Sequence, residues 1–155
     1  MAKSGSINFR DFERIQKNLE KLNQEQVDIF IDACAKELAA RLLAKVIKRT
    51  PVGEYPNSPG KKGGTLYRGW TGEKKSSAVA YANSLTIHHF ADAYVIEIIN
   101  PVEYASYVEF GHRTRDHKGW VDGRFMLTIS EQEIQQAAPA IIEKKLMKQM
   151  GELFS

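Results

Sequence analysis

The stretch EQVDIFIDACAKELAARLLAKVIKR, residues 25–49, decides the fold. Its apolar side chains recur at three- and four-residue spacing, which is the period of one face of an α-helix. They are Val27, Phe30, Ile31, Cys34, Leu38, Leu42, Val46 and Ile47. Proline follows at position 51, and the residue before a proline resists the helical conformation. The pattern therefore predicts one long helix that buries this stripe.

Both ends of the chain predict further helices. Residues 6–23 carry apolar side chains at helical spacing, which predicts a short N-terminal helix. Residues 124–150 show a second apolar stripe, and within it Ser130 and Glu133 fit a capping box. Pro139 is awkward inside such a helix, so we expect either a kink or a late helix start.

Three strand-like runs follow the long helix, at residues 66–71, 78–90 and 93–100. They contain β-branched and aromatic residues and are separated by short polar breaks. Runs of this kind are typical of an antiparallel arrangement. The sequence therefore predicts a β-meander over residues 66–100.

The third of these runs alternates, and both of its faces are largely apolar. One face carries Tyr94, Ile96 and Ile98, and the other carries Val95 and Ile99. A sheet with one apolar face can cover a helix and leave its other face in water. Here the second face also needs a cover, from elsewhere in this chain or from a neighbouring one.

The remaining segments predict two loops and a short helix. Residues 52–65 are rich in glycine and proline without an apolar pattern, which is typical of a mobile loop. Pro101 suits the first turn of a short helix over residues 101–110, and Gly111 suits the position just past its end. Residues 111–123 then form a second polar loop.

Length and composition indicate one ordinary domain. The chain has 155 residues, of which 43% are hydrophobic and 26% are charged, and its net charge is +3. We therefore expect a single domain over residues 1–155, of the α+β class, in which the two long helices pack on the small sheet. Cys34 is the only cysteine, so no disulfide can form within the chain. The start of the chain has no apolar run typical of a signal peptide, and we expect a soluble protein in a reducing cytoplasm.

The histidines do not predict a metal site. His88 and His89 are adjacent in a predicted strand and would point to opposite faces. His112 and His117 lie with Asp116 in a loop, at a spacing that matches no zinc motif. We expect no metal and no cofactor.

Catalytic signatures are weak as well. The stretch GKKGGT, residues 60–65, lacks the preceding strand and the closing G-K-[ST] of a phosphate-binding loop. Glu103 and Glu109 are six residues apart on the short helix and so lie well off a shared face. We expect no enzyme activity. A small hydrolase built on Glu109, His112 and Asp116 is the least favoured alternative.

A nucleic-acid-binding module is a second alternative. Small basic clusters in predicted loops could contact phosphate groups. They are Lys61 with Lys62, Lys74 with Lys75, and Arg113 with Arg115. Such charges more often solvate the tips of loops, and the mild net charge does not indicate a dedicated nucleic-acid reader.

Four motifs, in order, resemble a known family. They are KRTPV at residues 48–52, GTLYRGW at 64–70, NPVEYASYVEFGHRT at 100–114 and GRFML at 123–127. Their order resembles the tail-completion or head–tail joining (neck) proteins of tailed bacteriophages, typified by gene product ten of a lambdoid phage. The matching residues are Thr50, Pro51, Val52, Gly64, Leu66, Trp70, Tyr104, Ala105, Val108, Glu109, Phe110, Gly111, Arg113 and Phe125. The chain departs from the family in residues 52–65, where a longer insertion replaces a compact turn.

The resemblance implies an assembly protein without catalysis. Copies would form a ring in the neck that completes the tail and joins it to the head or portal, with DNA passing through the lumen. The ring would be a hexamer, or a dodecamer on the portal side. Its partners would be portal or adaptor, tail-terminator and tail-tube proteins, with non-specific contact to packaged DNA and no membrane. The protein would be found in the virion neck or tail, and in the host cytoplasm during assembly.

The resemblance also suggests which residues meet other subunits. The expected subunit or partner interface comprises Trp70, Tyr104, Tyr107, Glu109, Phe110, Arg113, Arg115 and Phe125. The loops expected to reach partners carry Tyr55, Lys61, Lys62, His117 and Trp120. Glu109 is expected to hold the end of the short helix by pairing with a nearby arginine.

Overall fold

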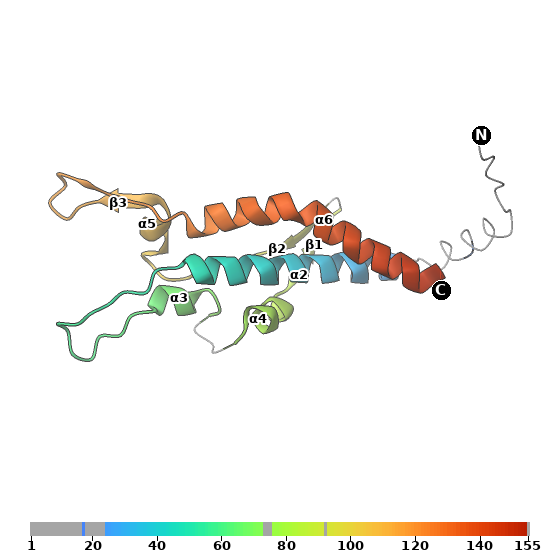
Figure 1. Ribbon diagram of the computed structural model, residues 1–155, viewed down its shortest axis with the longest axis horizontal. Coiled ribbons are helices and arrows are strands. Elements are labelled where there is room, and N and C mark those ends of the chain that lie inside the picture. The colour runs from blue at the N-terminus through green and yellow to red at the C-terminus, as the bar shows by residue number, and fades with distance from the viewer. Residues whose placement is uncertain (1–16, 18–23, 73–75, 92, 155) are drawn as a thin grey trace, which may run out of the picture.

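The computed structural model describes residues 17, 24–72, 76–91 and 93–154 (Figure 1). The predicted N-terminal helix over residues 6–23 lies outside these residues except for Lys17. The elements are α2 (Gln24–Arg49), α3 (Thr65–Gly69), α4 (Ala78–Ser84), β1 (Ile87–His89), β2 (Tyr94–Ile96), α5 (Ala105–Phe110), β3 (Gly111–Arg113), β4 (Trp120–Asp122) and α6 (Met126–Phe154).

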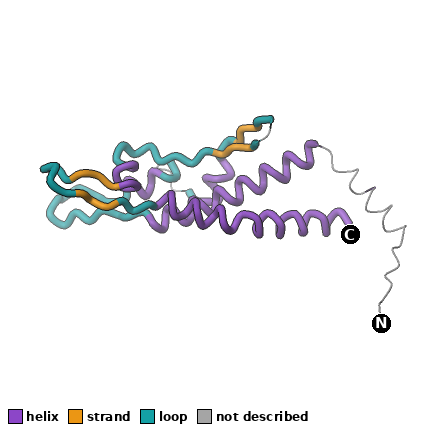
Figure 2. The backbone as a smooth tube through the Cα atoms, turned by 90° about the horizontal axis from the view of Figure 1, so that it is seen from above, coloured by secondary structure: helices purple, strands orange, loops and turns teal. Residues whose placement is uncertain are grey.

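The architecture is a mixed α+β arrangement built around two long helices. The helices α2 and α6 pack against each other, and α4 packs on another side of α2 (Figure 1). The strand β2 also lies against α2. The molecule is elongated, and the segment between α2 and α3 and the β3–β4 hairpin both extend from the same end (Figures 1 and 2). In the described parts of the chain, no helix is long and apolar enough to cross a membrane.

The long predicted helix is confirmed almost to the residue. It runs from Gln24 to Arg49, and the Thr50 amide and hydroxyl both donate to the Val46 carbonyl at its end. Its two fully buried side chains are Leu43 and Val46, and Leu43 is absent from the predicted apolar stripe. The reason is that α4 and α6 cover α2 from two sides, so burial extends beyond a single stripe.

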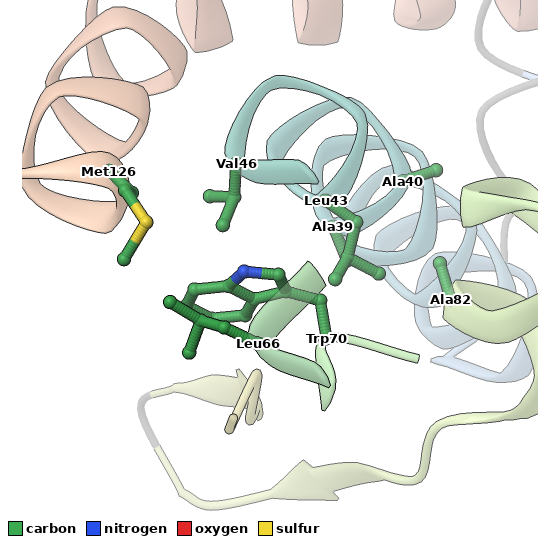
Figure 3. Packing of buried hydrophobic residues seen from close by; sticks show 8 residues of the cluster. All are labelled: Ala39, Ala40, Leu43, Val46, Leu66, Trp70, Ala82 and Met126. Atoms are coloured by element: carbon green, nitrogen blue, oxygen red, sulfur yellow. The ribbon is translucent and has the colours of Figure 1, made fainter. Parts of the chain in front are cut away.

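The core lies where the end of α2 meets α3 and the start of α6 (Figure 3). Leu66 and Trp70, both from the α3 region, lie beneath Val46 of α2, and Met126 of α6 lies beside them. The indole Nε1–H of Trp70 donates to Thr50 Oγ1 at 2.8 Å. This buried hydrogen bond fixes α3 to the end of α2.

The predicted β-meander over residues 66–100 is wrong in its first half. Residues 66–69 belong to α3 and residues 78–84 to α4, so only the β1–β2 hairpin remains, paired antiparallel with Ile87 opposite Ile96. Leu66 and Trp70 are four residues apart, a spacing at which a helical turn lets both reach the core. Ser77 caps α4 by accepting from the Ala80 amide at 3.1 Å. Tertiary burial and capping therefore override strand propensity here.

In the second half of the chain, several predicted boundaries of helices and loops also differ from the observed ones. The short helix predicted over residues 101–110 begins at Ala105, and the loop predicted over residues 111–123 contains the β3–β4 hairpin. The C-terminal helix begins at Met126, close to its predicted start at residue 124. Of the two alternatives expected for Pro139, a kink or a late helix start, the structure excludes the late start. Pro139 lies inside α6, whose ribbon changes direction near mid-length (Figure 1).

The predicted capping box at Ser130 and Glu133 is also wrong. Ser130 already lies inside α6, where its hydroxyl donates to the Met126 carbonyl at 2.6 Å. Glu133 instead forms ion pairs across the helix interface with Lys45, at 2.8 Å, and with Arg49. These polar residues therefore join α6 to α2 and do not cap a helix.

A second ion-pair group joins the same two helices further along. Glu37 contacts Lys145 at 2.7 Å and Arg41 at 3.1 Å. A hydrogen bond from Lys145, and to a smaller extent one from Arg41, holds the pKa of Glu37 below its ordinary value. A hydrogen bond from Lys45, and to a smaller extent one from Arg49, likewise lowers the pKa of Glu133. Both carboxylates are thus stabilised in their charged form by the folded arrangement.

We expect these pairs to make the fold sensitive to acid. A carboxyl group with a lowered pKa in the folded state adds stability that is present above its unfolded pKa and is lost as pH falls through the folded value. The free energy of unfolding of the protein should therefore drop as pH falls below about 5. The Glu133→Gln variant should lose part of this dependence, as measured by urea unfolding at a series of pH values. Glu143→Gln, on an exposed part of α6, is the control, and an unchanged pH profile for Glu133→Gln would contradict the assignment.

Candidate functional site

The candidate site lies at the end of the molecule from which the β3–β4 hairpin projects (Figure 2). It is built from α5, the hairpin arm and the first turn of α6. We use "hairpin arm" for residues 111–124, which include β3, β4 and the turn between them. The strands pair antiparallel, with Arg113 opposite Trp120 and His112 opposite Val121.

Glu109 holds these elements together. It lies on α5 with only 6% of its surface exposed. Its carboxylate accepts hydrogen bonds from the Leu127 amide at 3.0 Å and from the Thr128 amide at 2.8 Å. The Thr128 hydroxyl donates to it as well, at 2.7 Å. The sequence predicts an arginine as the partner of Glu109, and the structure corrects this to the first turn of α6.

The geometry makes Glu109 the cap of a helix to which it does not belong. The first amides of a helix lack partners within the helix, and a capping side chain usually accepts from the second or third. The residue before α6 is Phe125, which has no polar side chain and adopts φ 48°. Glu109 supplies the missing acceptor from α5, and its negative charge faces the positive end of the helix dipole.

Backbone hydrogen bonds close the same junction. The Arg124 amide donates to the Val108 carbonyl at 2.7 Å, and the Phe125 amide donates to the Glu109 carbonyl at 3.0 Å. A Cβ atom on Gly123 would lie 2.3 Å from the Glu109 carbonyl oxygen, so this contact requires glycine. The two sequence motifs around Glu109 and Phe125 are therefore two sides of one tightly packed joint.

Large aromatic side chains surround this joint and remain exposed. Phe110 is 62% exposed and packs its ring edge-on against Phe125, with centroids 6.5 Å apart. Tyr107 is also exposed and lies 5.8 Å from the His112 ring. Tyr104 and Trp120 are exposed nearby in the chain. Arg113 and Arg115 are exposed too, so most of the predicted interface residues are on the surface.

Two predicted interface residues are not on the surface. Trp70 is 3% exposed and belongs to the core described above, and Glu109 is engaged with α6. Both therefore act on the fold of a single chain. An apolar tryptophan at a motif position fits a core and an interface equally well, and sequence alone did not separate the two.

The predicted partner-reaching residues lie on two extensions at one end. In the segment between α2 and α3, the ammonium group of Lys61 lies 5.0 Å from the centre of the Tyr55 ring. Lys62 is exposed in the same segment, and His117 is exposed in the turn of the hairpin arm. The basic pair Lys74–Lys75 lies outside the described residues.

A groove runs between α5, α6 and the chain that follows β2. Its volume is about 340 Å³, and we call it the α5–α6 groove. Its walls include Ile98, Ile99, Ala105, Phe110, Leu127 and Glu131. Ile96 and Ile98 pack on the core, as predicted for one face of this run, whereas Ile99 on the other face is 61% exposed. The second face thus has no cover among the described residues.

The arrangement does not assemble acid–base chemistry. Both oxygens of Glu109 accept hydrogen bonds from α6. Asp116 lies in the hairpin turn, where hydrogen bonds from the Thr114 hydroxyl and the Lys118 amide lower its pKa. The two carboxylates proposed for a hydrolase therefore have separate structural partners. Among the residues with described positions, no group of three or more His, Cys, Asp or Glu is placed to hold a metal ion.

A family model described as "Bacteriophage HK97-gp10, putative tail-component" matches residues 13–111. The match covers more than half of the chain and extends from before α2 to Gly111, the first residue of β3, so it includes Glu109. It confirms the resemblance inferred from the four motifs. No curated protein and no solved structure matches the chain significantly.

We expect loss of the Glu109 carboxylate to destabilise the fold. Glu109→Ala should lower the free energy of unfolding by about 2 to 3 kcal/mol, because two helix amides and one hydroxyl lose a charged acceptor. Glu109→Gln keeps one acceptor oxygen and should cost less. Urea unfolding of the variants measures both effects.

Glu103→Ala is the matched control, since Glu103 is an exposed carboxylate just before α5. Its effect should stay within about 0.5 kcal/mol. Equal stability of Glu109→Ala and Glu103→Ala would show that Glu109 does not cap α6.

Proposed function

Because the chain belongs to the HK97-gp10-like family of bacteriophage tail components, we propose that it is a structural protein of the virion neck. In this role it completes the tail and joins it to the head or portal. Copies of the chain form a ring, and DNA passes through its lumen. The protein acts by assembly and carries out no catalysis.

The observation that carries the proposal is the exposed apolar surface at one end of the molecule. Phe110, Trp120 and Ile99 each leave more than half of their surface uncovered. Exposed apolar patches on a folded chain mark sites that meet another protein. Aromatic side chains beside arginine are also the usual anchors of protein contacts. This end of the chain therefore suits contact with other subunits.

The stiffness of the surface supports the same conclusion. The aromatic side chains sit on a joint fixed by Glu109 and by two backbone hydrogen bonds. A surface that is ordered before it binds loses little conformational entropy on binding. The exposed residues of α5 and the hairpin arm are thus suited to repeated, identical contacts in a symmetric assembly.

The two extensions suit contact with adjoining rings. Both extend from the end of the molecule where α5 lies (Figures 1 and 2). In the proposed neck they would reach portal or adaptor proteins on one side, or tail-terminator and tail-tube proteins on the other. Their exposed Lys61, Lys62, Arg113 and Arg115 could also contact the passing DNA without sequence preference.

The proposal is tested by the mass of the purified protein in solution. Light scattering over a range of concentrations should reveal a discrete species of six times the 17.5 kDa chain, or twelve times for a portal-side ring. In parallel, phage lacking the protein should yield heads and tails that fail to join. A chain that stays monomeric, together with normal joining in its absence, would overturn the proposal. Salt-dependent binding of that monomer to duplex DNA would then favour the nucleic-acid alternative.

A further inference from the structure

The α5–α6 groove offers more than an apolar hollow, because the chain along one wall has an open backbone edge. After β2 ends at Ile96, residues 97–99 take part in no strand pairing and no backbone hydrogen bond among the described residues. Ile99 in this segment is 61% exposed. A segment whose backbone groups are unpaired is a template for an added strand or hairpin. The groove is thus equipped to receive an extended piece of polypeptide.

The hairpin arm carries apolar side chains that are largely exposed, so it could supply the polypeptide that the groove receives. It is a two-stranded sheet, which is marginal in water unless it packs against something else. Its strands pair with each other and contact the body of the molecule through α5. On β4, Trp120 is 59% exposed and Val121 is 46% exposed. Packing against a second surface would therefore stabilise the hairpin arm.

The charges of the two surfaces are complementary. The arm carries four exposed cations: Arg113, Arg115, Lys118 and Arg124. Its two carboxylates are Asp116 and Asp122, and Asp116 accepts hydrogen bonds from Thr114 and Lys118 within the turn. The ionisable groups that line the groove are both acidic, Glu109 and Glu131, and Glu131 is exposed. Glu97 and Glu103, each close in sequence to a lining residue, are exposed as well.

We propose that the hairpin arm of one copy docks in the α5–α6 groove of a neighbouring copy. Trp120 fills the apolar hollow, and Arg113, its partner across the hairpin on the same face, meets Glu131 at the rim. This inference rests on the proposed ring and identifies the surfaces that build it. Arm and groove are different parts of the chain, so the contact can repeat head-to-tail from copy to copy, and a head-to-tail contact forms a ring where its rotation closes.

A cross-linking experiment tests the contact directly. The full chain carries Cys34→Ala, which removes its only cysteine, together with Lys118→Cys at the tip of the arm and Ser106→Cys in the groove. A short bis-maleimide should then give a ladder of covalent multimers on a denaturing gel. The matched control replaces Ser106→Cys by Ser84→Cys, an exposed serine of α4 outside the groove, and should give no ladder.

A charge exchange tests the same contact without cysteine. Arg113→Glu and Glu131→Arg should each raise the dissociation constant of the assembly about tenfold, because like charges then meet. The double variant should restore assembly, as expected for two residues that touch. Lys144→Glu, an exposed change elsewhere on α6, should have no effect. Thermal unfolding of each variant checks that the chain remains folded.

The outcomes separate this inference from the proposed function. A ladder that ends at the ring size, with rescue by the double variant, supports both. Covalent dimers alone support the contact but show two copies exchanging arms in place of a ring. A ring-sized assembly with no more cross-linking than the control, and with no rescue, overturns the arm-and-groove contact and leaves the ring. A strict monomer without a ladder overturns both.

Discussion

The structure depends on one carboxylate placed at the start of a helix. Glu109 satisfies the first amides of α6 from a position on α5, and it does so where the chain itself offers only Phe125. Because the charge is buried, it contributes to the fold only while its donors stay in place. The angle between α5 and α6 is therefore fixed, and with it the direction in which the hairpin arm leaves the body.

That single joint determines the shape of both candidate contact surfaces. On one side, α5 and the first turn of α6 form walls of the α5–α6 groove. On the other, Gly123 allows the hairpin arm to lie in direct contact with α5, and Gly111 allows the backbone of β3 to lie close to Val121 and Gly123. The core beneath is modest, built where Trp70 and Leu66 meet Val46 and Met126 (Figure 3). A small core with large exposed aromatics is what a chain that completes its burial in an assembly would show.

The sequence predicts the strongly periodic parts and misses those decided by tertiary contacts. The long helix and the outward apolar face around Ile99 follow from spacing alone. Residues 66–69 and 78–84 look like strands by composition, but they form helices. Leu66 of α3 packs in the core with Val46, α4 packs on α2, and Ser77 caps α4. The sequence also does not predict the partner of Glu109, because the Leu127 and Thr128 amides lie in a different segment of the chain. One feature of the sequence does indicate such a partner. Phe125, the residue before α6, has no side chain that can cap the helix, so the first amides of α6 need a hydrogen-bond acceptor from another segment.

Amide hydrogen exchange, compared between the isolated chain and the assembled particle, tests the central claim most directly. That claim is that assembly uses the end of the molecule fixed by Glu109. The account predicts slower exchange in the particle for the amides of residues 97–99 and of the hairpin arm, whose backbone edges are open in the single chain. Exchange of α4 should not change. Protection that appears on α4 while the hairpin arm exchanges as fast as before would contradict the account.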